Sequence, residues 1–167
     1  IIPFHNEQEV ISECQRRISA AVAAIDMQIE ILYVNDGSKD DSLDILIALM
    51  QQDKRIKIID LSRNFGKETA MTAGLDVAKG DAVVIIDADL QDPPELITEM
   101  VKIWRTGFDV VYAKRTKRKG ESLIKKATAR LFYKLINKIS DHEIPENVGD
   151  FRLMSRQAVD ALNQVRE

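Results

Sequence analysis

Short segments that are apolar almost throughout alternate with amphipathic patterns along this chain, and this alternation constrains its fold most strongly. The expected strands lie at residues 1–3, 29–34, 56–61, 82–86, 109–113 and, more weakly, 151–154. The expected helices lie at residues 8–24, 42–52, 67–78, 94–105, 123–139 and 156–165. Strands that are apolar on both faces suit a sheet that helices cover on both sides. The sequence therefore predicts an α/β fold with a mostly parallel sheet flanked by helices.

The length of 167 residues suits one domain, and we predict a single domain over residues 1–167. Hydrophobic residues make up 45% and charged residues 31%, which argues against disorder. Cys14 is the only cysteine, which excludes an internal disulfide and fits a reducing compartment. Because the sequence starts at Ile1 and stops inside a helical pattern, we expect a soluble fragment trimmed at both ends. Membrane helices would lie beyond residue 167.

Charge is distributed unevenly along the chain. Residues 114–138 carry ten Lys or Arg and one acid, whereas the rest carries 14 basic and 26 acidic residues. Such a basic segment indicates an anionic partner. Its apolar residues form one helical stripe over residues 123–139, with Lys125, Lys126 and Arg130 beside it. This pattern is typical of a helix on an anionic membrane, and also of a core helix with a solvated basic face.

Polar residues gather after successive strands, where open α/β sheets bind ligands. Asp87 and Asp89 follow the fourth strand, and their spacing points both carboxylates to one side. Two carboxylates form an oxygen site suited to Mg²⁺ or Mn²⁺, to which Gln91 would add a carbonyl oxygen. The two like charges need a counter-charge, which favours a metal. Asp92 directly precedes two prolines, and we interpret it as a helix cap.

Other polar residues after the strands keep two interpretations each. Asp36 lies in an Asp-Gly-Ser turn, and it either shapes that turn or binds a base or ribose. Glu7 is either an acid at a helix N-terminus or a nucleotide contact. His5 and His142 have no partners at metal-ligand spacing, so neither is expected to be catalytic.

Several common motifs are missing from the sequence. It contains no G-x-x-x-x-G-K-[ST] and no G-x-G-x-x-G, so neither a P-loop nor a dinucleotide fingerprint is present. It contains no G-x-S-x-G either, which weakens a hydrolase assignment. Phosphates are therefore expected to be neutralised by a metal and by Arg or Lys.

Five motifs occur in order along the chain: IPFHNE, VNDGS, LSRNFGKETAMTAGLD, DADLQDPPE and GDFRLMSR. Together they closely resemble the family 2 glycosyltransferases that act on polyprenyl phosphates, which include bactoprenol glucosyltransferases and dolichyl-phosphate mannose synthases. The resemblance covers essentially the whole chain, and the last two motifs point to the bactoprenol branch. It implies a GT-A fold, a metal-dependent enzyme with Mg²⁺ or Mn²⁺, and transfer of a hexose from a UDP- or GDP-sugar to a lipid phosphate with inversion.

The resemblance also implies roles for individual residues. The residues that would bind the nucleotide-diphosphosugar are Pro3, Glu7, Asp36, Asp87 and Lys67. The metal would be held by Asp89 and Gln91. The catalytic group would consist of Asp89, Arg152 and Asp150, the last as a base or an orienting group. The acceptor phosphate or the membrane would meet Arg115, Arg118, Lys125, Lys126 and Arg130.

The resemblance does not fix the sugar, but UDP-glucose and undecaprenyl phosphate are favoured, at the cytoplasmic side of the plasma membrane. One alternative is a soluble glycosyltransferase with a glycan or protein acceptor. Another is a non-catalytic module that binds nucleotide or an anionic membrane. No nucleic-acid recognition motif accompanies the basic segment, so no nucleic-acid partner is expected. The oligomeric state stays open, a homo-oligomer included.

Overall fold

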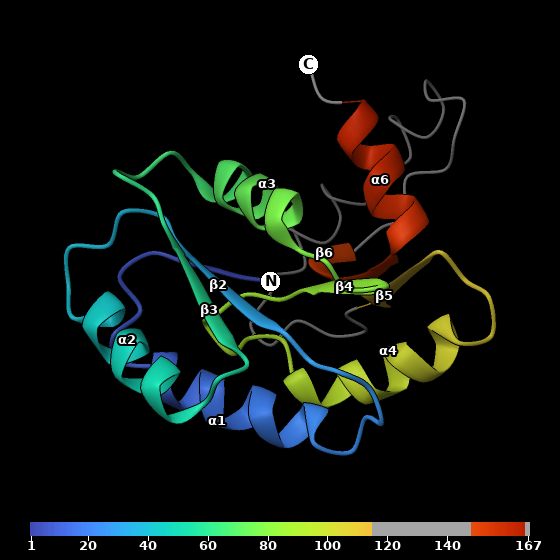
Figure 1. The fold of residues 1–167 in the computed structure, drawn as a ribbon, viewed down its shortest axis with the longest axis horizontal. Coiled ribbons are helices and arrows are strands. Elements are labelled where there is room, and N and C mark those ends of the chain that lie inside the picture. The colour runs from blue at the N-terminus through green and yellow to red at the C-terminus, as the bar shows by residue number, and fades with distance from the viewer. Residues whose placement is uncertain (115–147, 166–167) are drawn as a thin grey trace, which may run out of the picture. The chain divides into compact units, whose positions relative to one another are not determined.

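The computed structural model describes residues 1–114 and 148–165, and residues 1–112 form one compact unit with the chain from Asp150 onwards. The elements, shown in Figure 1, are β1 (Ile2–Phe4), α1 (Ile11–Val22), β2 (Ile31–Asn35), α2 (Ser42–Gln52), β3 (Ile56–Asp60), α3 (Lys67–Val77), β4 (Ala82–Ile85), η1 (Pro94–Leu96), α4 (Ile97–Trp104), β5 (Val110–Lys114), β6 (Val148–Ser155) and α6 (Arg156–Gln164). Strands and helices alternate as expected, and the α/β fold class is confirmed.

Two three-stranded sheets, ordered β1-β2-β3 and β4-β6-β5, are joined by two backbone hydrogen bonds between Ile1 and the β4 segment. β1, β2 and β3 are hydrogen-bonded neighbours in that order, with Ile2 opposite Tyr33. β4 lies on the other side of β1. The Ile1 nitrogen donates to the Val84 carbonyl oxygen at 2.7 Å, and the Ile86 nitrogen donates to the Ile1 carbonyl oxygen at 3.1 Å. Every residue of β2 is buried, as expected for a strand that is covered on both faces.

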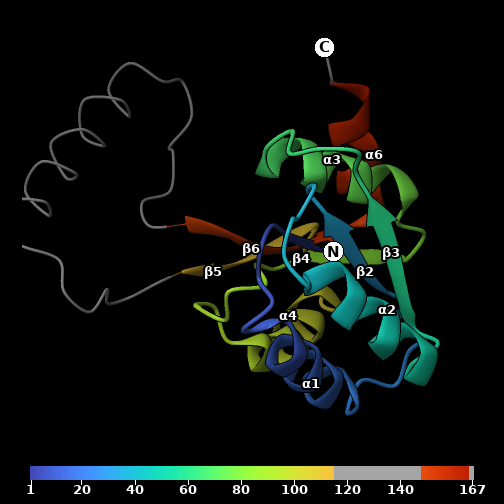
Figure 2. The same ribbon diagram turned by 90° about the vertical axis from the view of Figure 1, so that its left-hand side faces the viewer.

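The last strand departs from the expected arrangement. β6 pairs with β4 in the antiparallel sense, with Ile85 opposite Arg152. It lies between β4 and β5, and Figure 2 shows β5 and β6 side by side. It is also longer than expected, with 8 residues instead of the four at 151–154. A mostly parallel sheet is thus correct for β1 to β4, but it fails for the β4–β6 pair because an apolar pattern does not encode strand direction.

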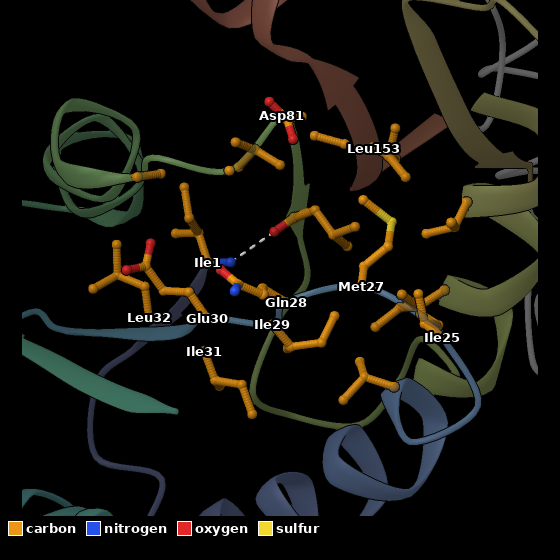
Figure 3. A pocket seen from close by; sticks show the side chains of 18 of the residues that line it. Ile1, Ile25, Met27, Gln28, Ile29, Glu30, Ile31, Leu32, Asp81 and Leu153 are labelled. Carbon is orange, nitrogen blue, oxygen red and sulfur yellow. Dashed lines mark hydrogen bonds between the residues drawn. The ribbon is translucent and has the colours of Figure 1, made fainter. Parts of the chain in front are cut away.

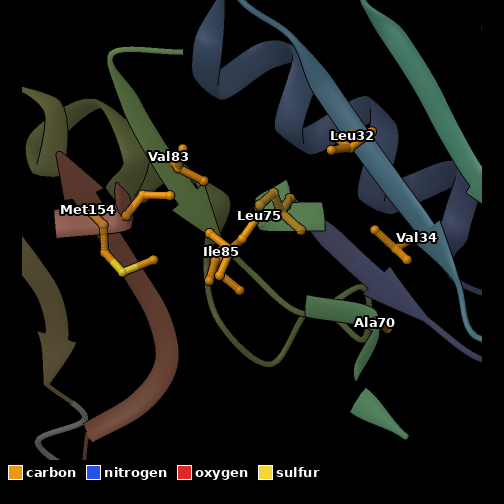
Figure 4. Packing of buried hydrophobic residues seen from close by; sticks show 9 residues of the cluster. Leu32, Val34, Ala70, Leu75, Val83, Ile85 and Met154 are labelled. Atoms are coloured by element: carbon orange, nitrogen blue, oxygen red, sulfur yellow. The ribbon is translucent and has the colours of Figure 1, made fainter. Parts of the chain in front are cut away.

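Helices cover both faces of this sheet. α3 and α6 lie on one face, and α1, α2 and α4 lie on the other (Figures 1 and 2). Under α3 the core contains the cluster in Figure 4: Leu32, Val34, Ala70, Leu75, Val83, Ile85 and Met154. Gly74 lets α3 approach the sheet closely, because a Cβ there would lie 2.5 Å from Cγ2 of Ile1. This close packing holds α3 in place against β1 and β2.

Three expected helix features need correction. α1 begins at Ile11 and not at residue 8, because the carbonyl of Glu7 accepts hydrogen bonds from the backbone of Val10 and Ile11 and closes a turn. The helix expected over residues 94–105 starts as the 3₁₀ turn η1 and continues as α4. Its N-cap position belongs to Pro93, and not to the buried Asp92. The helix expected over residues 123–139 lies outside the described residues.

Candidate functional site

A cleft of about 350 Å³ opens where β1, β2 and β4 end. Its walls come from the segments that follow β1, β2 and β4 and from the first turn of α3 with the loop before it. The lining residues are Pro3, Phe4, His5, Glu7, Asp36, Asn64, Gly66, Lys67, Ala70, Asp87, Ala88 and Asp89. The structure thus brings together five residues that the sequence assigned to nucleotide-sugar binding, together with Asp89.

A second cavity, of about 480 Å³, lies at the opposite ends of β2 and β4. Figure 3 shows its largely aliphatic walls, with Ile25, Ile29 and Leu153 among them. Largely aliphatic walls of this kind suit the packing of apolar side chains against one another. The cleft, by contrast, gathers four carboxylates and a lysine, which are groups able to bind metals and phosphates. The smaller cleft is therefore the candidate site.

Asp36 anchors the loop that forms one wall of the cleft. It is 4% exposed, its Oδ1 accepts a hydrogen bond from the Phe65 nitrogen at 2.7 Å, and its Oδ2 accepts one from the Gly66 nitrogen at 3.0 Å. The carboxylate thus has a structural role, but it binds the loop after β3 and not the Asp-Gly-Ser turn, whose Ser38 nitrogen donates to Asn35. Each carboxylate oxygen keeps a second lone pair, so the contact with a base or ribose stays a prediction.

Side chains also tie the loop after β1 to the loop after β2. Nδ1 of His5 donates to the carbonyl oxygen of Asp36 at 2.8 Å, and the backbone nitrogen of Asn6 donates to Oγ of Ser38 at 2.9 Å. Asn6 has a φ of 56°, a conformation that few residues other than glycine adopt. These bonds hold it there and give His5 a structural partner. Hydrogen bonds within the protein therefore hold this rim of the cleft in place.

The acidic segment after β4 turns sharply at the cleft. Oδ1 of Asp89 accepts a hydrogen bond from the backbone nitrogen of Gln91 at 3.0 Å. Leu90, between them, has a φ of 60°, which is a strained conformation for a leucine. Asp89 lines the cleft, whereas Gln91 is exposed and is not among the lining residues. Its place as a metal ligand stays a prediction.

Lys67, the first residue of α3, connects two acidic side chains. Its Nζ lies 2.7 Å from both carboxylate oxygens of Asp87 and 2.7 Å from Oδ2 of Asp150 on β6. Arg152 donates to the other oxygen of Asp150 at 3.2 Å. The hydrogen bond from Lys67 lowers the pKa of Asp150 below its usual value. Burial alone would lower the pKa of Lys67, but its bonds to Asp150 and Asp87 outweigh burial and raise it.

The donor groups of the cleft fit a divalent metal that shares its coordination with a ligand. Oδ1 of Asp87 is buried and makes no hydrogen bond within the described residues, although the Lys67 ammonium lies 2.7 Å from it as an ion-pair partner. Over that same part of the chain, no group of three or more His, Cys, Asp or Glu could hold a metal. Two carboxylates, Asp87 and Asp89, suit a hard ion that takes its other ligands from phosphate oxygens and water. Such an ion would compete with Lys67 for the oxygens of Asp87.

Glu7 carries charge that the ligand-free cleft does not balance. Burial raises its pKa, and the charges of Asp89, Asp40 and Asp87 raise it further. A raised carboxyl pKa means that ionisation of Glu7 costs stability at neutral pH, and that this cost vanishes as pH falls through the raised pKa. We expect Glu7→Gln to raise the thermal midpoint of the ligand-free protein by about 1–2 °C at pH 7, and less at pH 4.

Thermal unfolding at both pH values tests this expectation. Glu9→Gln is the matched control, because Glu9 is exposed and does not line the cleft. A lower midpoint for Glu7→Gln at pH 7, or an equal gain for both variants, would contradict the electrostatic interpretation.

Some expected site residues fall outside the described part of the chain. They are the acceptor or membrane residues Arg115, Arg118, Lys125, Lys126 and Arg130. Three other residues, Asn64, Gly66 and Ala70, line the cleft although the sequence assigned them no role. Their position after the third strand, at the same edge as the other site segments, is the signal that could have found them.

The fold and the cleft together define a class of protein. The structure resembles the mannosyltransferase PcManGT from Pyrobaculum calidifontis, solved with GDP-Man and Mn²⁺, with a TM-score of 0.67 and 20% identity over 96% of this chain and 45% of that one. It also resembles glucosyl-3-phosphoglycerate synthase from Mycobacterium tuberculosis in complex with UDP, with a TM-score of 0.65 and 23% identity over 93% of this chain and 55% of that one. The chain therefore has a GT-A glycosyltransferase fold.

Residues 1–162 match the family described as Glycosyl transferase family 2, and the chain belongs to this family. It is 51% identical to the uncharacterized glycosyltransferase YkcC of Bacillus subtilis over its full length and 52% of that protein. It is 45% identical to the bactoprenol glucosyl transferase of Shigella phage SfV, over its full length and 54% of that protein. The chain thus spans about half the length of these relatives. Within the described residues, no helix combines the length and apolarity needed to cross a membrane.

Proposed function

We propose that this chain is the catalytic domain of an enzyme that transfers a hexose from a nucleotide-diphosphosugar to a polyprenyl phosphate. UDP-glucose is the favoured donor, and undecaprenyl phosphate at the cytoplasmic side of the plasma membrane is the favoured acceptor. The observation that carries the proposal is the cleft in which Asp87 and Asp89 lie beside Lys67, which in turn contacts Asp150. Relatives named bactoprenol glucosyl transferase support the choice of acceptor.

The donor end of the cleft divides into two parts in this proposal. Pro3, Glu7 and Asp36 face the nucleoside, and Asp87 and Asp89 hold Mg²⁺ or Mn²⁺ against the diphosphate. A bound divalent ion would offset charge on the departing nucleoside diphosphate. The hydrogen bonds from Phe65 and Gly66 to Asp36 keep this wall ordered, so little conformational entropy is lost when the donor binds.

The transfer step requires no strong base. An oxygen of the lipid phosphate, already anionic at neutral pH, attacks the anomeric carbon. The new C–O bond forms as the bond from that carbon to the diphosphate oxygen breaks, and the configuration inverts. Asp150 holds one cation on each of its carboxylate oxygens, Lys67 and Arg152, and its pKa is lowered. A carboxylate with a lowered pKa is a weak base, which supports an orienting role for Asp150.

Calorimetric titration of this chain with UDP and with GDP, with and without Mn²⁺, tests the donor assignment. We expect UDP to bind, and Mn²⁺ to tighten its binding about tenfold or more. A preference for GDP would keep the mechanism but move the donor to a GDP-sugar. Absence of binding for both nucleotides would contradict a nucleotide-sugar enzyme.

Two alternatives remain for the whole protein, because the described residues do not include the expected acceptor segment. A glycosyltransferase with a glycan or protein acceptor would use the same donor cleft. A non-catalytic module would bind the nucleotide without turnover. Assays of the full-length protein with UDP-glucose separate them: transfer to polyprenyl phosphate supports the proposal, transfer to another acceptor supports the first alternative, and no transfer supports the second.

A further inference from the structure

Lys67 occupies the position from which a cation balances the acids of the cleft. Its ammonium group contacts both carboxylate oxygens of Asp87, and it also binds Asp150. Asp87 is one of the two carboxylates that fit a divalent metal. A metal that approaches Asp87 therefore meets an ammonium group already in contact with the oxygens it needs.

The charges around the cleft explain why this cation is there. The lining residues include four acids, Glu7, Asp36, Asp87 and Asp89, and among the described residues Lys67 is the only Lys or Arg that lines the cleft. Burial raises the pKa of Glu7 most, and the charges of Asp89, Asp40 and Asp87 raise it further, in agreement with a negative potential. The positive charge of Lys67 makes that potential less negative while no ligand is bound. It therefore weakens the attraction of the cleft for a second cation.

A bound diphosphate would reverse this balance. It brings negative charge and oxygen ligands for a metal, and it accepts hydrogen bonds from an ammonium group. Lys67 has three N–H groups, so it can bind a phosphate oxygen and keep its bond to Asp150 while it leaves Asp87. The oxygens of Asp87 then become available at the moment when the diphosphate supplies the remaining ligands.

We propose that Lys67 is an internal counter-cation that excludes divalent metals from the nucleotide-free cleft and so makes metal binding conditional on a nucleoside diphosphate. This inference rests on the proposed function. It assigns Lys67 a positioning role: the residue sets the order in which metal and donor assemble. By linkage, the factor by which nucleotide strengthens metal binding equals the factor by which metal strengthens nucleotide binding.

The test is calorimetric titration of Mn²⁺ into wild-type chain, Lys67→Met and Lys67→Arg, each with and without saturating UDP. Wild type is expected to bind Mn²⁺ weakly alone and strongly with UDP. Lys67→Met is expected to bind Mn²⁺ about tenfold more tightly than wild type without UDP, because the competing charge is gone, and to gain less from UDP. Lys67→Arg retains the charge and is expected to behave like wild type without UDP.

Two further variants control for trivial effects. Lys102→Met makes the same substitution on α4, where Lys102 pairs with Glu99 away from the cleft, and is expected to leave Mn²⁺ binding unchanged. Adding Asp89→Ala to Lys67→Met is expected to abolish the gained affinity, which places the gained site in the cleft. Circular dichroism of every variant verifies that the fold is intact.

The outcomes separate the inference from the function on which it rests. If UDP strengthens Mn²⁺ binding in wild type but Lys67→Met does not bind Mn²⁺ more tightly without UDP, the inference is wrong and the proposed function stands. If wild type binds Mn²⁺ equally well with and without UDP, both are wrong. Tighter nucleotide-free binding in Lys67→Met alone, lost on addition of Asp89→Ala, supports both.

Discussion

Replacing Asp89 with alanine is expected to lower glycosyl transfer by the full-length protein about 10²- to 10³-fold. Asp89 and Asp87 are the two carboxylates of the cleft that fit a divalent ion. With one of them gone, the ion would lose a ligand, and charge on the departing diphosphate would go largely uncompensated. The loss should appear mainly in kcat, because that charge develops as the sugar leaves. Initial rates at several UDP-glucose and Mn²⁺ concentrations measure it.

Asp81→Ala is the matched control for Asp89→Ala. Asp81 is an exposed aspartate at the opposite end of β4, and its structural bond is made by its backbone carbonyl, which accepts from the Arg156 nitrogen at 2.7 Å. This variant should keep wild-type kcat and Mn²⁺ dependence. If Asp89→Ala retained more than about a third of the activity with unchanged Mn²⁺ dependence, the metal assignment of Asp89 would have to be abandoned.

The second large effect concerns stability. Gly37→Ala is expected to destabilise the fold by about 3 kcal/mol or more. Gly37 has a φ of 63°, and a Cβ there would lie 2.3 Å from the Arg63 carbonyl carbon and 2.5 Å from the Asn64 nitrogen. These neighbours are backbone atoms of the loop that Asp36 anchors, so relief of the clash would break the Asp36 hydrogen bonds. We expect the thermal midpoint to fall by about 6–12 °C.

Gly107→Ala is the control that shows the effect of an unfavourable backbone conformation without a steric clash. Gly107 has a φ of 103°, but a Cβ added there would meet no atom within 4 Å. The Gly107→Ala substitution should lower the free energy of unfolding by only about 1 kcal/mol, which corresponds to a thermal midpoint about 2–4 °C lower. Equal losses of stability in the two variants would show that close packing at Gly37 contributes nothing. We also expect Gly37→Ala to weaken UDP binding, because Asn64 and Gly66 line the cleft.

The sequence predicted the fold class because hydrophobic periodicity is a local signal and the elements are short and distinct. The segments after β1, β2 and β4 were also predictable as the site, since parallel strands bring their carboxyl ends to one edge. β2 illustrates the success: its buried residues from Ile31 to Val34 are apolar in the sequence, and Asp36 lies just after the strand at the cleft.

Contacts between distant residues were not predictable in the same way. The bond from Lys67 to Asp150 joins residues 83 positions apart, and the resemblance assigned Lys67 to nucleotide-sugar binding and Asp150 to catalysis. The carboxylate of Asp36 bonds to backbone nitrogens, which carry no residue-specific signal. The antiparallel direction of β6 is defined by its pairing with β4, between residues about 70 positions apart. Each of these features is set by three-dimensional packing, which one sequence without relatives does not reveal.

The antiparallel pair of β4 and β6 fixes the two acids that Lys67 joins relative to each other. Asp87 follows β4, and Asp150 lies in β6. The side chains of Phe151 and Leu153, also in β6, are buried, with 1% and 0% of their surface exposed. A shift of one residue would turn Asp150 to the other face and remove both apolar side chains from their buried positions, so burial locks the register. The separation of the two acids therefore does not depend on the length or composition of residues 115–147. A designed chimaera that replaces that stretch is therefore expected to keep the arrangement of Asp87, Lys67 and Asp150, which UDP binding by the chimaera would check.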